Sequence, residues 1–416
     1  MKVYKFGGAS IKDADSIQNV AKILKSEGTE GCLLVISAMG KMTNAFENIV
    51  HAYCYDKASF KKSLDFVVGF HEDIVNALFD EPNIVLDKVS GLFKNLNSFL
   101  AKNDSKSYDY LYDQIVSVGE LLSTTIVSNY FVEEGIENIW NDVRKLIITD
   151  NSHRDAKVDW QKTQETIIES IDQKKLNIVQ GFLGGDTKGN TTTLGREGSD
   201  YTAGIFAYCL DAKEVTIWKD VEGVLNADPR VFKETQLLEQ ISYEETIEMA
   251  FYGASVIHPK TIQPLQSKEI PLFVRSFKDL NLKGTKVTRG VAIKPYLPCF
   301  IVKKDQILVS ISALDFSFMV ENNISHIFKL LHQYLLKVNL IQNSAISFSV
   351  CVDNKFNQFE TFLEELKSSY KVDVVKGVDL YTVRHFTDKS LGEIQQNGLP
   401  LLTQINKETA QIVIKQ

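Results

Sequence analysis

The first 36 residues contain the feature that most restricts the fold of this chain. A short apolar strand, Val3 to Phe6, runs directly into the glycine pair Gly7-Gly8, and apolar residues at helical spacing predict a helix from Asp13 to Ser26. The apolar run Cys32 to Ile36 then has the composition of a strand buried on both faces. Strand, helix and buried strand in this order form a βαβ unit, which predicts a parallel sheet.

The rest of the chain predicts two or three domains, because 416 residues are too many for one ordinary core. A long helical pattern at about 43–130 is interpreted as a helical insertion. Strands are expected at 145–148, 177–182, 214–218 and 271–274, mostly alternating with helical segments. We therefore predict an α/β domain over residues 1–290, with a mostly parallel central sheet.

A different order of elements begins near residue 291. Strands and helices alternate as βαββαβ over residues 291–377, and a shorter, weaker copy of this order occupies residues 378–416. Small α+β units of this kind usually regulate or dimerise a protein rather than catalyse, an expectation that rests on fold analogy.

Composition excludes several classes of function. The chain carries 46 basic and 53 acidic side chains, a net charge of −7, with no block of Lys and Arg. This argues against a nucleic-acid partner or an anionic membrane surface. No apolar run reaches the roughly 18–20 residues of a membrane helix. The N-terminus lacks the apolar core of a signal peptide, and the five cysteines are widely spaced, so a reducing cytoplasm is expected.

Two glycine-rich segments are candidate anion sites. Gly7-Gly8 follows a strand, so the backbone can approach an oxyanion closely, and Lys5 could reach the same anion. The alternative is a tight turn with a surface lysine. In Gly195–Asp200, Arg196 is flanked by glycines and could grip a carboxylate through two hydrogen bonds. The alternative there is a capped loop with a solvated arginine.

Two further segments are ambiguous by themselves. Glu120 lies among small and apolar residues, where it is either a buried anion that awaits an ammonium group or a surface residue of an amphipathic helix. The strand ending at Lys219-Asp220 is followed by a turn rich in Gly, Asn, Asp and Pro, which could hold a ribose or a base edge.

Six motifs together resemble those of the aspartate kinases, within the amino acid kinase family. They are KFGGAS, SVGELLS, QGFLG, TTTLGREGSD, KDVEGVLNADPR and YGASVIHPKTI, in the family's order and over roughly residues 1–385. The resemblance implies an amino-acid-kinase-like three-layer sandwich followed by ACT-like units, the second one truncated. It also implies the substrates L-aspartate and ATP, Mg²⁺ carried on the ATP phosphates rather than by a protein metal site, and a homodimer joined through the C-terminal units.

The resemblance also assigns roles to individual residues. The implied catalytic residues are Lys5, Gly8 and Asp200. Those implied for L-aspartate are Ser37, Thr43, Glu120, Arg196 and Ser199. Those implied for the nucleotide are Lys5, Gly7, Gly8, Ser10, Lys219, Asp220, Asp228, Arg230 and Lys260. Two positions depart from the family pattern: Ala9 replaces a Thr, and Ser255 replaces a Lys that Lys260 could substitute.

The chemistry implied by the resemblance needs no general base. The β-carboxylate of aspartate has a pKa of about 3.9, so it is ionised at neutral pH. Transfer of the phosphoryl group then depends on positioning and charge neutralisation. Two alternatives remain: an amino-acid kinase of the glutamate type, and a catalytically silent regulatory homologue.

Regulation by lysine is expected to be weak. Lysine-sensitive aspartate kinases bind the effector with acidic residues near the second strand of the first ACT-like unit. This chain has Asn339 and Ala345 at the corresponding positions. An ammonium group buried without a carboxylate is costly, so we predict that these units chiefly dimerise the protein.

Overall fold

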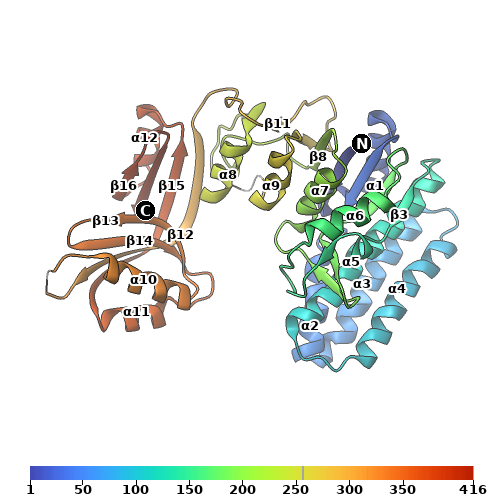
Figure 1. Ribbon diagram of the computed structural model, residues 1–416, viewed down its shortest axis with the longest axis horizontal. Helices are drawn as coiled ribbons and strands as arrows, with labels where there is room; N and C mark the ends of the chain where they lie inside the picture. Colours follow the sequence, from blue (N-terminus) through green and yellow to red (C-terminus); the bar gives the residue numbers. More distant parts are fainter. Residues whose placement is uncertain (255–256, 316, 416) are drawn as a thin grey trace. The chain divides into compact units, whose positions relative to one another are not determined.

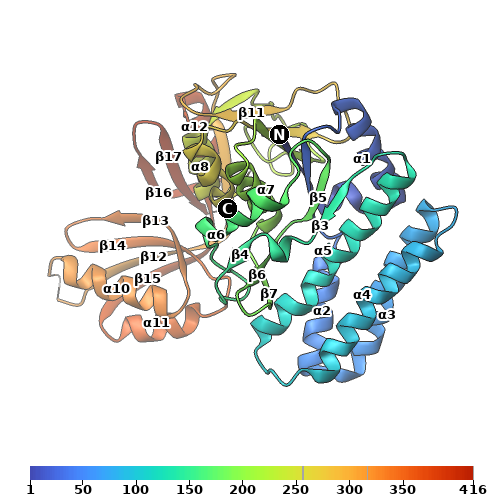
Figure 2. The ribbon, with the colours of Figure 1, turned by 45° about the vertical axis from the view of Figure 1, so that its right-hand side comes forward.

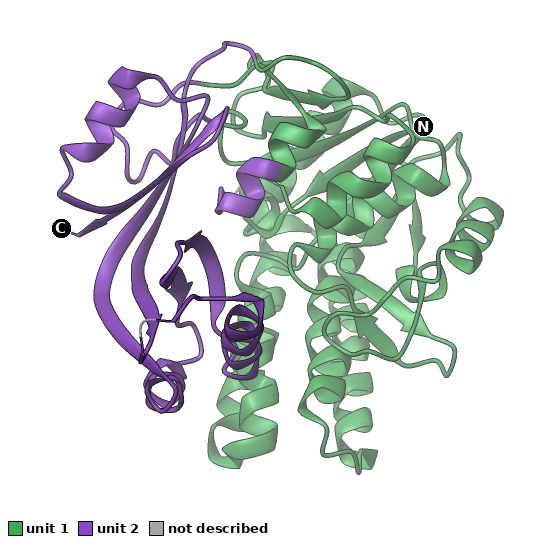
Figure 3. Ribbon diagram, turned by 60° about the vertical axis from the view of Figure 1, so that its left-hand side comes forward, with its two compact units in different colours: residues 1–224, 237–247, 256–293 green, residues 225–236, 248–255, 294–416 purple. Residues whose placement is uncertain are grey.

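The structure is a computed structural model that describes residues 1–254, 257–315 and 317–415. The chain divides into two compact units (Figure 3). Unit 1 comprises residues 1–224, 237–247 and 256–293, and unit 2 comprises residues 225–236, 248–255 and 294–416.

Many of the elements that lie wholly in unit 1 are labelled in Figures 1 and 2. Its helices are η1 (Gly8–Ile11), α1 (Ala14–Glu27), α2 (Met42–Tyr55), α3 (Lys57–Leu78), α4 (Asn83–Lys102), α5 (Tyr108–Glu133), η2 (Val143–Lys145), α6 (Trp160–Ser170), α7 (Gly198–Cys209) and α9 (Pro259–Ser267). Its strands are β1 (Lys2–Phe6), β2 (Cys32–Ile36), β3 (Ile139–Asn141), β4 (Ile148–Thr149), β5 (Asn177–Gln180), β6 (Leu183–Asp186), β7 (Thr191–Thr193), β8 (Glu214–Lys219), β9 (Gln240–Ser242), β10 (Leu272–Ser276) and β11 (Thr285–Thr288).

The main sheet of unit 1 has eight strands in the order β3-β5-β2-β1-β8-β10-β11-β9. All neighbouring pairs are parallel except β10 and β11. The parallel sheet predicted from the first 36 residues is therefore confirmed. The chain moves from β1 to β2 on one side, while β8 pairs on the other side of β1, so the strand order reverses at β1. Such a reversal opens a crevice at the carboxyl ends of the strands, where α/β folds bind ligands.

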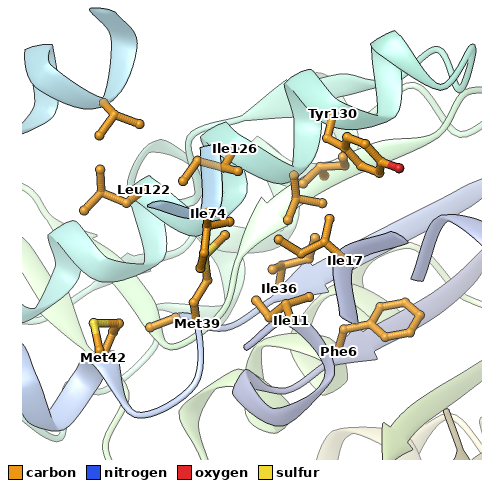
Figure 4. Packing of buried hydrophobic residues seen from close by; sticks show 14 of the residues in the cluster. Phe6, Ile11, Ile17, Ile36, Met39, Met42, Ile74, Leu122, Ile126 and Tyr130 are labelled. Atoms are coloured by element: carbon orange, nitrogen blue, oxygen red, sulfur yellow. The ribbon is translucent and has the colours of Figure 1, made fainter. Parts of the chain in front are cut away.

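Alternation along β1 separates the two faces of this sheet. Tyr4 and Phe6 belong to one continuous core with residues of α1 to α5, so they face the helical layer. Figure 4 shows Phe6, Ile11 and Ile36 packed together in this core, and α3, α4 and α5 supply others of its residues. Lys5 points to the opposite face, because successive side chains of a strand alternate. That face is covered by α7, which contacts β1 and β8.

Helix α5 is the central element of the helical layer. It is long and apolar enough to cross a membrane by length and composition, although the sequence shows no uninterrupted apolar run of that length. Most of this apolar window is buried inside the structure. A core helix of a folded domain passes the same test, so the helix is weak support for a membrane span.

Two short segments differ from the strands expected at 145–148 and 177–182. The first contains the end of η2 and the beginning of β4, because Asp142 accepts the backbone N–H of Arg144 at 3.2 Å and stabilises a turn there. The second ends as a strand at Gln180, since Phe182 has a φ of +72° that interrupts extended backbone. Strand β6 then joins the separate sheet β4-β6-β7.

Unit 2 is built on a six-stranded sheet in the order β13-β14-β12-β15-β17-β16, antiparallel throughout. Its elements are β12 (Cys299–Ala313), α10 (Glu321–Gln333), β13 (Lys337–Asn343), β14 (Ser347–Asp353), α11 (Phe359–Lys367), β15 (Tyr370–Arg384), α12 (Asp388–Gln395), β16 (Leu399–Ile405) and β17 (Thr409–Lys415). Helix α8 (Tyr243–Tyr252) begins in unit 1 and ends in unit 2. The long strands β12 and β15 run through both halves of the sheet, so the expected α+β units share one sheet.

Candidate active site

The site lies at the carboxyl edge of the central strands of unit 1. Phe6 at the end of β1 pairs with Ile36 of β2 and with Trp218 of β8, so the three strands end at the same level. The segments that follow these strands therefore meet at one edge. The glycine pair follows β1, Ser37 follows β2, and Lys219 is the last residue of β8, which explains why residues far apart in the sequence converge.

A buried carboxylate between two lysines forms the centre of this edge. The Asp200 side chain, in the first turn of α7, lies 2.6 Å from Lys5 Nζ and 4.0 Å from Lys219 Nζ. Burial raises the pKa of Asp200, but the charges of Lys5 and Lys219 outweigh it and hold that pKa below its usual range. The carboxylate is therefore ionised, and it fixes the positions of two ammonium groups. The alternative of a surface lysine at position 5 is wrong, since the Lys5 side chain is only 12% exposed.

Gly8 allows two loops to approach closely. A Cβ at this position would lie 2.5 Å from the carbonyl oxygen of Gly40 and 2.8 Å from that of Ala38, distances that real Cβ atoms do not tolerate. The backbone N–H of Gly40 donates to the carbonyl of Gly8 at 3.0 Å. The glycine therefore joins the turn after β1 to the loop after β2, which supplies Ser37 and leads to Thr43.

Glu120 is buried in α5 and is 2% exposed, so the surface alternative for this residue is wrong. Its Oε2 has no hydrogen-bond partner in the described part of the chain. Burial raises the pKa of Glu120 to about 8, although a backbone hydrogen bond from Ala38 partly opposes this. A carboxyl group with an unsatisfied oxygen in a cavity wall is suited to a ligand that brings a positive charge.

These groups surround one cavity of about 460 Å³. Eight of the residues expected from the sequence line it: Lys5, Gly8, Ser37, Thr43, Glu120, Arg196, Ser199 and Asp200. Glu197, with a φ of +53°, precedes α7 and separates Arg196 from the helix. Arg196 is exposed at this turn, so its guanidinium is accessible to a ligand.

The other expected residues are not among those that line the cavity. Lys219 Nζ lies 4.0 Å from Asp200, which does line the cavity. Ser10 is buried, and its Oγ has no hydrogen-bond partner in the part of the chain that the structure describes. Lys260 pairs with Asp155. Gly7 and the exposed Asp220 also lie outside the lining set.

Two of the residues expected for the nucleotide belong to unit 2. Asp228 and Arg230 form a close ion pair with each other, and the Arg230 side chain is 80% exposed. Ser255, the second departure from the family pattern, lies outside the described residues.

Several residues of the cavity wall were not predicted from the sequence. They include Tyr112, Arg154, Phe182 and Glu197. Glu197 lies inside the segment Gly195–Asp200, and Phe182 lies inside the motif QGFLG, so their places in these motifs could have indicated them. Arg154 lies between short elements without any periodic pattern, and no sequence signal placed it here.

Comparisons with known proteins agree with this geometry. The model of the amino acid kinase family matches residues 1–276. Lysine-sensitive aspartokinase 3 of Escherichia coli is 31% identical over 391 residues, which cover 91% of this chain and 85% of that protein. The bifunctional aspartokinase/homoserine dehydrogenase 2 of Arabidopsis thaliana is 32% identical over 68% of this chain, a match that spans 32% of its own length.

Solved structures lead to the same family. Aspartokinase III of E. coli in complex with lysine and aspartate superimposes with a TM-score of 0.84 at 28% identity, covering 100% of this chain and 96% of that one. The same enzyme in complex with aspartate and ADP gives a TM-score of 0.82. The chain belongs to the amino acid kinase family and, within it, to the aspartokinases.

Proposed function

We propose that this chain transfers the γ-phosphoryl group of ATP to the β-carboxylate of L-aspartate, which yields 4-phospho-L-aspartate and ADP. This reaction is the first step towards lysine, threonine and methionine. The observation that carries the proposal is the single cavity in which the Lys5–Asp200 pair, Glu120 and Arg196 meet. The E. coli relative holds aspartate and ADP in a solved structure of the same fold, which supports both substrates.

The charges of the cavity match those of aspartate. Glu120 would accept the substrate ammonium, which supplies the partner that its Oε2 lacks. Arg196 would bind the α-carboxylate, since a guanidinium pairs with a carboxylate through two hydrogen bonds. Ser37, Thr43 and Ser199 would complete the aspartate site with hydroxyl groups. The β-carboxylate would then face the carboxyl edge of β1, where Lys5 lies.

Phosphoryl transfer would depend on charge placed in advance. The attacking β-carboxylate is ionised at neutral pH, so no group has to remove a proton from it. Lys5 and Lys219 would neutralise charge on the phosphoryl oxygens, and the backbone near Gly7 and Gly8 would add N–H donors. Asp200 would act by holding both lysines in position, because each of its oxygens already faces one ammonium group. We also propose contacts with the nucleotide for the remaining residues that the resemblance implies: Ser10, Asp220, Asp228, Arg230 and Lys260.

Mg²⁺ would enter with the nucleotide. In the described residues no group of three or more His, Cys, Asp and Glu side chains converges on one point. Mg²⁺ commonly keeps several waters and binds through substrate phosphates, so ATP can carry it. When bound, it would neutralise phosphate charge in addition to the lysines.

Detection of the acyl phosphate separates this function from its alternatives. Hydroxylamine traps 4-phospho-L-aspartate as the hydroxamate, and ADP release is measured in parallel with aspartate, with glutamate and without an amino acid. We expect hydroxamate only with aspartate. A product with glutamate would indicate the glutamate-type kinase, and no product with any amino acid would indicate a silent homologue. Lys5→Ala is the inactive control.

Unit 2 would join two copies of the chain. Phe318 and Ile346 are 68% and 46% exposed, and their loops are linked by a hydrogen bond from Met319 N–H to the Ala345 carbonyl. Beside them, β13 is an edge strand with Ile341 39% exposed. An unpaired edge next to exposed apolar side chains is suited to pairing with a second copy.

Light scattering after size exclusion tests the dimer. The native chain should have twice the mass of one chain, and the Phe318→Ser/Ile346→Ser variant should be monomeric. Phe66→Ser is the matched control, because Phe66 is 60% exposed on α3 in unit 1. Dissociation by the control alone would contradict an interface in unit 2.

A further inference from the structure

Arg154 lines the same cavity as Glu120 and Arg196, but it has no role in the reaction proposed above. It brings a second guanidinium to a site that already contains one. The group lies in unit 1, as do all of the residues discussed with it.

The backbone of Arg154 is held in an uncommon conformation. Its φ is +68°, in the left-handed region that non-glycine residues rarely adopt. Asp113, fully buried in α5, accepts the N–H of Arg154 with both oxygens, at 3.1 and 3.2 Å. The same carboxylate accepts a hydrogen bond from Thr193 Oγ1 at 2.7 Å and lies 2.9 Å from His153 Nδ1. A strained residue fixed by a buried carboxylate is typical of functional sites.

The guanidinium is positioned but not strongly bound. It stacks over the ring of Tyr112, with 4.2 Å between its central carbon and the ring centroid, and Tyr112 also lines the cavity. Its ion partners are Glu47 at 3.3 Å and Asp109 at 3.6 Å. All three side chains are 40% or more exposed, and exposed ion pairs contribute little free energy. A ligand carboxylate can therefore replace Glu47 and Asp109 at small cost.

The chemistry of the reaction decides which carboxylate this would be. A guanidinium bound to the attacking β-carboxylate would withdraw electron density from the nucleophile and slow the transfer. The α-carboxylate does not react, so two guanidinium groups can hold it. Two cations on one carboxylate also discriminate against substrates that carry an amide there, because an amide lacks the charge.

We propose that Arg154 is a substrate-binding residue that, together with Arg196, binds the α-carboxylate of L-aspartate in exchange for Glu47 and Asp109. This inference rests on the proposed function and adds a specificity residue to it. It identifies the charge on the α-carboxylate as the feature that Arg154 recognises.

The test compares Arg154→Gly with the native chain. Glycine adopts a φ of +68° freely, so the variant loses the guanidinium without strain in the backbone. The KM for aspartate should rise about tenfold, the equivalent of one partly exposed charged hydrogen bond. The kcat and the KM for ATP should stay nearly constant. The inhibition constant of L-aspartate α-amide, which lacks the α-carboxylate, should change little, and Arg154→Lys should give an intermediate KM.

Other outcomes decide against the inference. Equal losses for aspartate and for the α-amide would mean that Arg154 only shapes the cavity. An unchanged KM for aspartate in Arg154→Gly would exclude contact with the substrate. Arg289→Ala, which removes an exposed arginine paired with Glu269, controls for the loss of one positive charge. If the native chain makes no aspartyl hydroxamate, the proposed function itself fails. The assignment of Arg154 is then tested separately, by calorimetric measurement of aspartate binding to the native chain and to Arg154→Gly.

Discussion

Replacement of Glu120 by Gln tests the proposed site most directly, because the carboxyl group affects stability and substrate binding in opposite directions. The carboxyl is buried, its Oε2 lacks a partner in the described part of the chain, and its pKa is raised to about 8. Gln has nearly the same shape and resembles the protonated acid. The change therefore removes the charge and little else.

The effect on stability follows from the direction of the pKa shift. In the unfolded chain Glu120 ionises near its ordinary pKa of 4.5, whereas in the folded chain it keeps its proton up to about 8. The folded state therefore binds more protons between these values, and stability falls as the pH rises through that window. Each pH unit costs about 1.4 kcal/mol, so from pH 5.5 to 7.5 the native chain should lose about 3 kcal/mol relative to Glu120→Gln.

The effect on substrate binding has the opposite sign. At pH 7 a group with a pKa of about 8 is only about one-tenth ionised, and the ionised form is the one that pairs with an ammonium group. The KM for aspartate should fall about tenfold from pH 7 to pH 9 in the native chain. In Glu120→Gln it should be high at every pH.

Urea unfolding of both proteins at pH 5.5 and 7.5 measures the first effect, and the other ionisable groups cancel in the difference. Steady-state kinetics from pH 6.5 to 9 measures the second. Two results would refute the reasoning: a stability difference between the two proteins that is the same at pH 5.5 and 7.5, or the same pH dependence of KM in both proteins.

Three further predictions address other parts of the molecule. Lys5→Ala should lower kcat at least about 10²-fold. It should also destabilise the fold by about 3 kcal/mol, because the buried Asp200 carboxylate loses its nearer ammonium partner and is left with Lys219 at 4.0 Å. Urea unfolding of Lys5→Ala/Asp200→Asn should show recovered stability without activity. Burial lowers the pKa of His71 to about 4, so the unfolded chain binds more protons than the folded one between pH 6.5 and 4. Acid should therefore destabilise the native chain by up to about 3 kcal/mol over this range, and denaturant unfolding of His71→Gln should not show this loss. Lysine in large excess should barely inhibit the kinase assay, because Asn339 is an amide that already accepts the Lys303 ammonium at 2.7 Å; strong inhibition would contradict this.

Local pattern predicted the parts of the fold that repeat regularly. The strands at β1, β2 and β8 and the helical region 43–130 follow from apolar spacing, which local side chains decide. The boundaries at 145–148 and after Gln180 could not be predicted, because one capping carboxylate and one positive φ determine them. Neither feature changes the apolar pattern.

The site likewise contains residues that the sequence predicts and residues that it does not. Residue patterns indicated Lys5, Gly8, Glu120 and Arg196, and the resemblance to the aspartate kinases added Ser37, Thr43, Ser199 and Asp200. All eight residues line the cavity. A polar residue at a strand end usually contributes little to a core, but the Lys5 ammonium lies 2.6 Å from the buried carboxylate of Asp200, a contact that the apolar pattern does not reveal. Arg154 was missed because its position depends on Asp113, 41 residues away in the sequence.

A substrate analogue without the ammonium group separates the two charges that Glu120 and the arginines recognise. Succinate has both carboxylates of aspartate but no amino group, so it can bind while Glu120 stays protonated. Its inhibition constant should therefore be nearly constant from pH 6.5 to 7.5 and should rise as Glu120 ionises above pH 8, since a buried anion without a partner then faces the ligand. The KM for aspartate should move the other way over the same range. Competitive inhibition measured at each pH decides the matter: parallel trends for succinate and aspartate would show that another group, common to both ligands, controls the pH dependence.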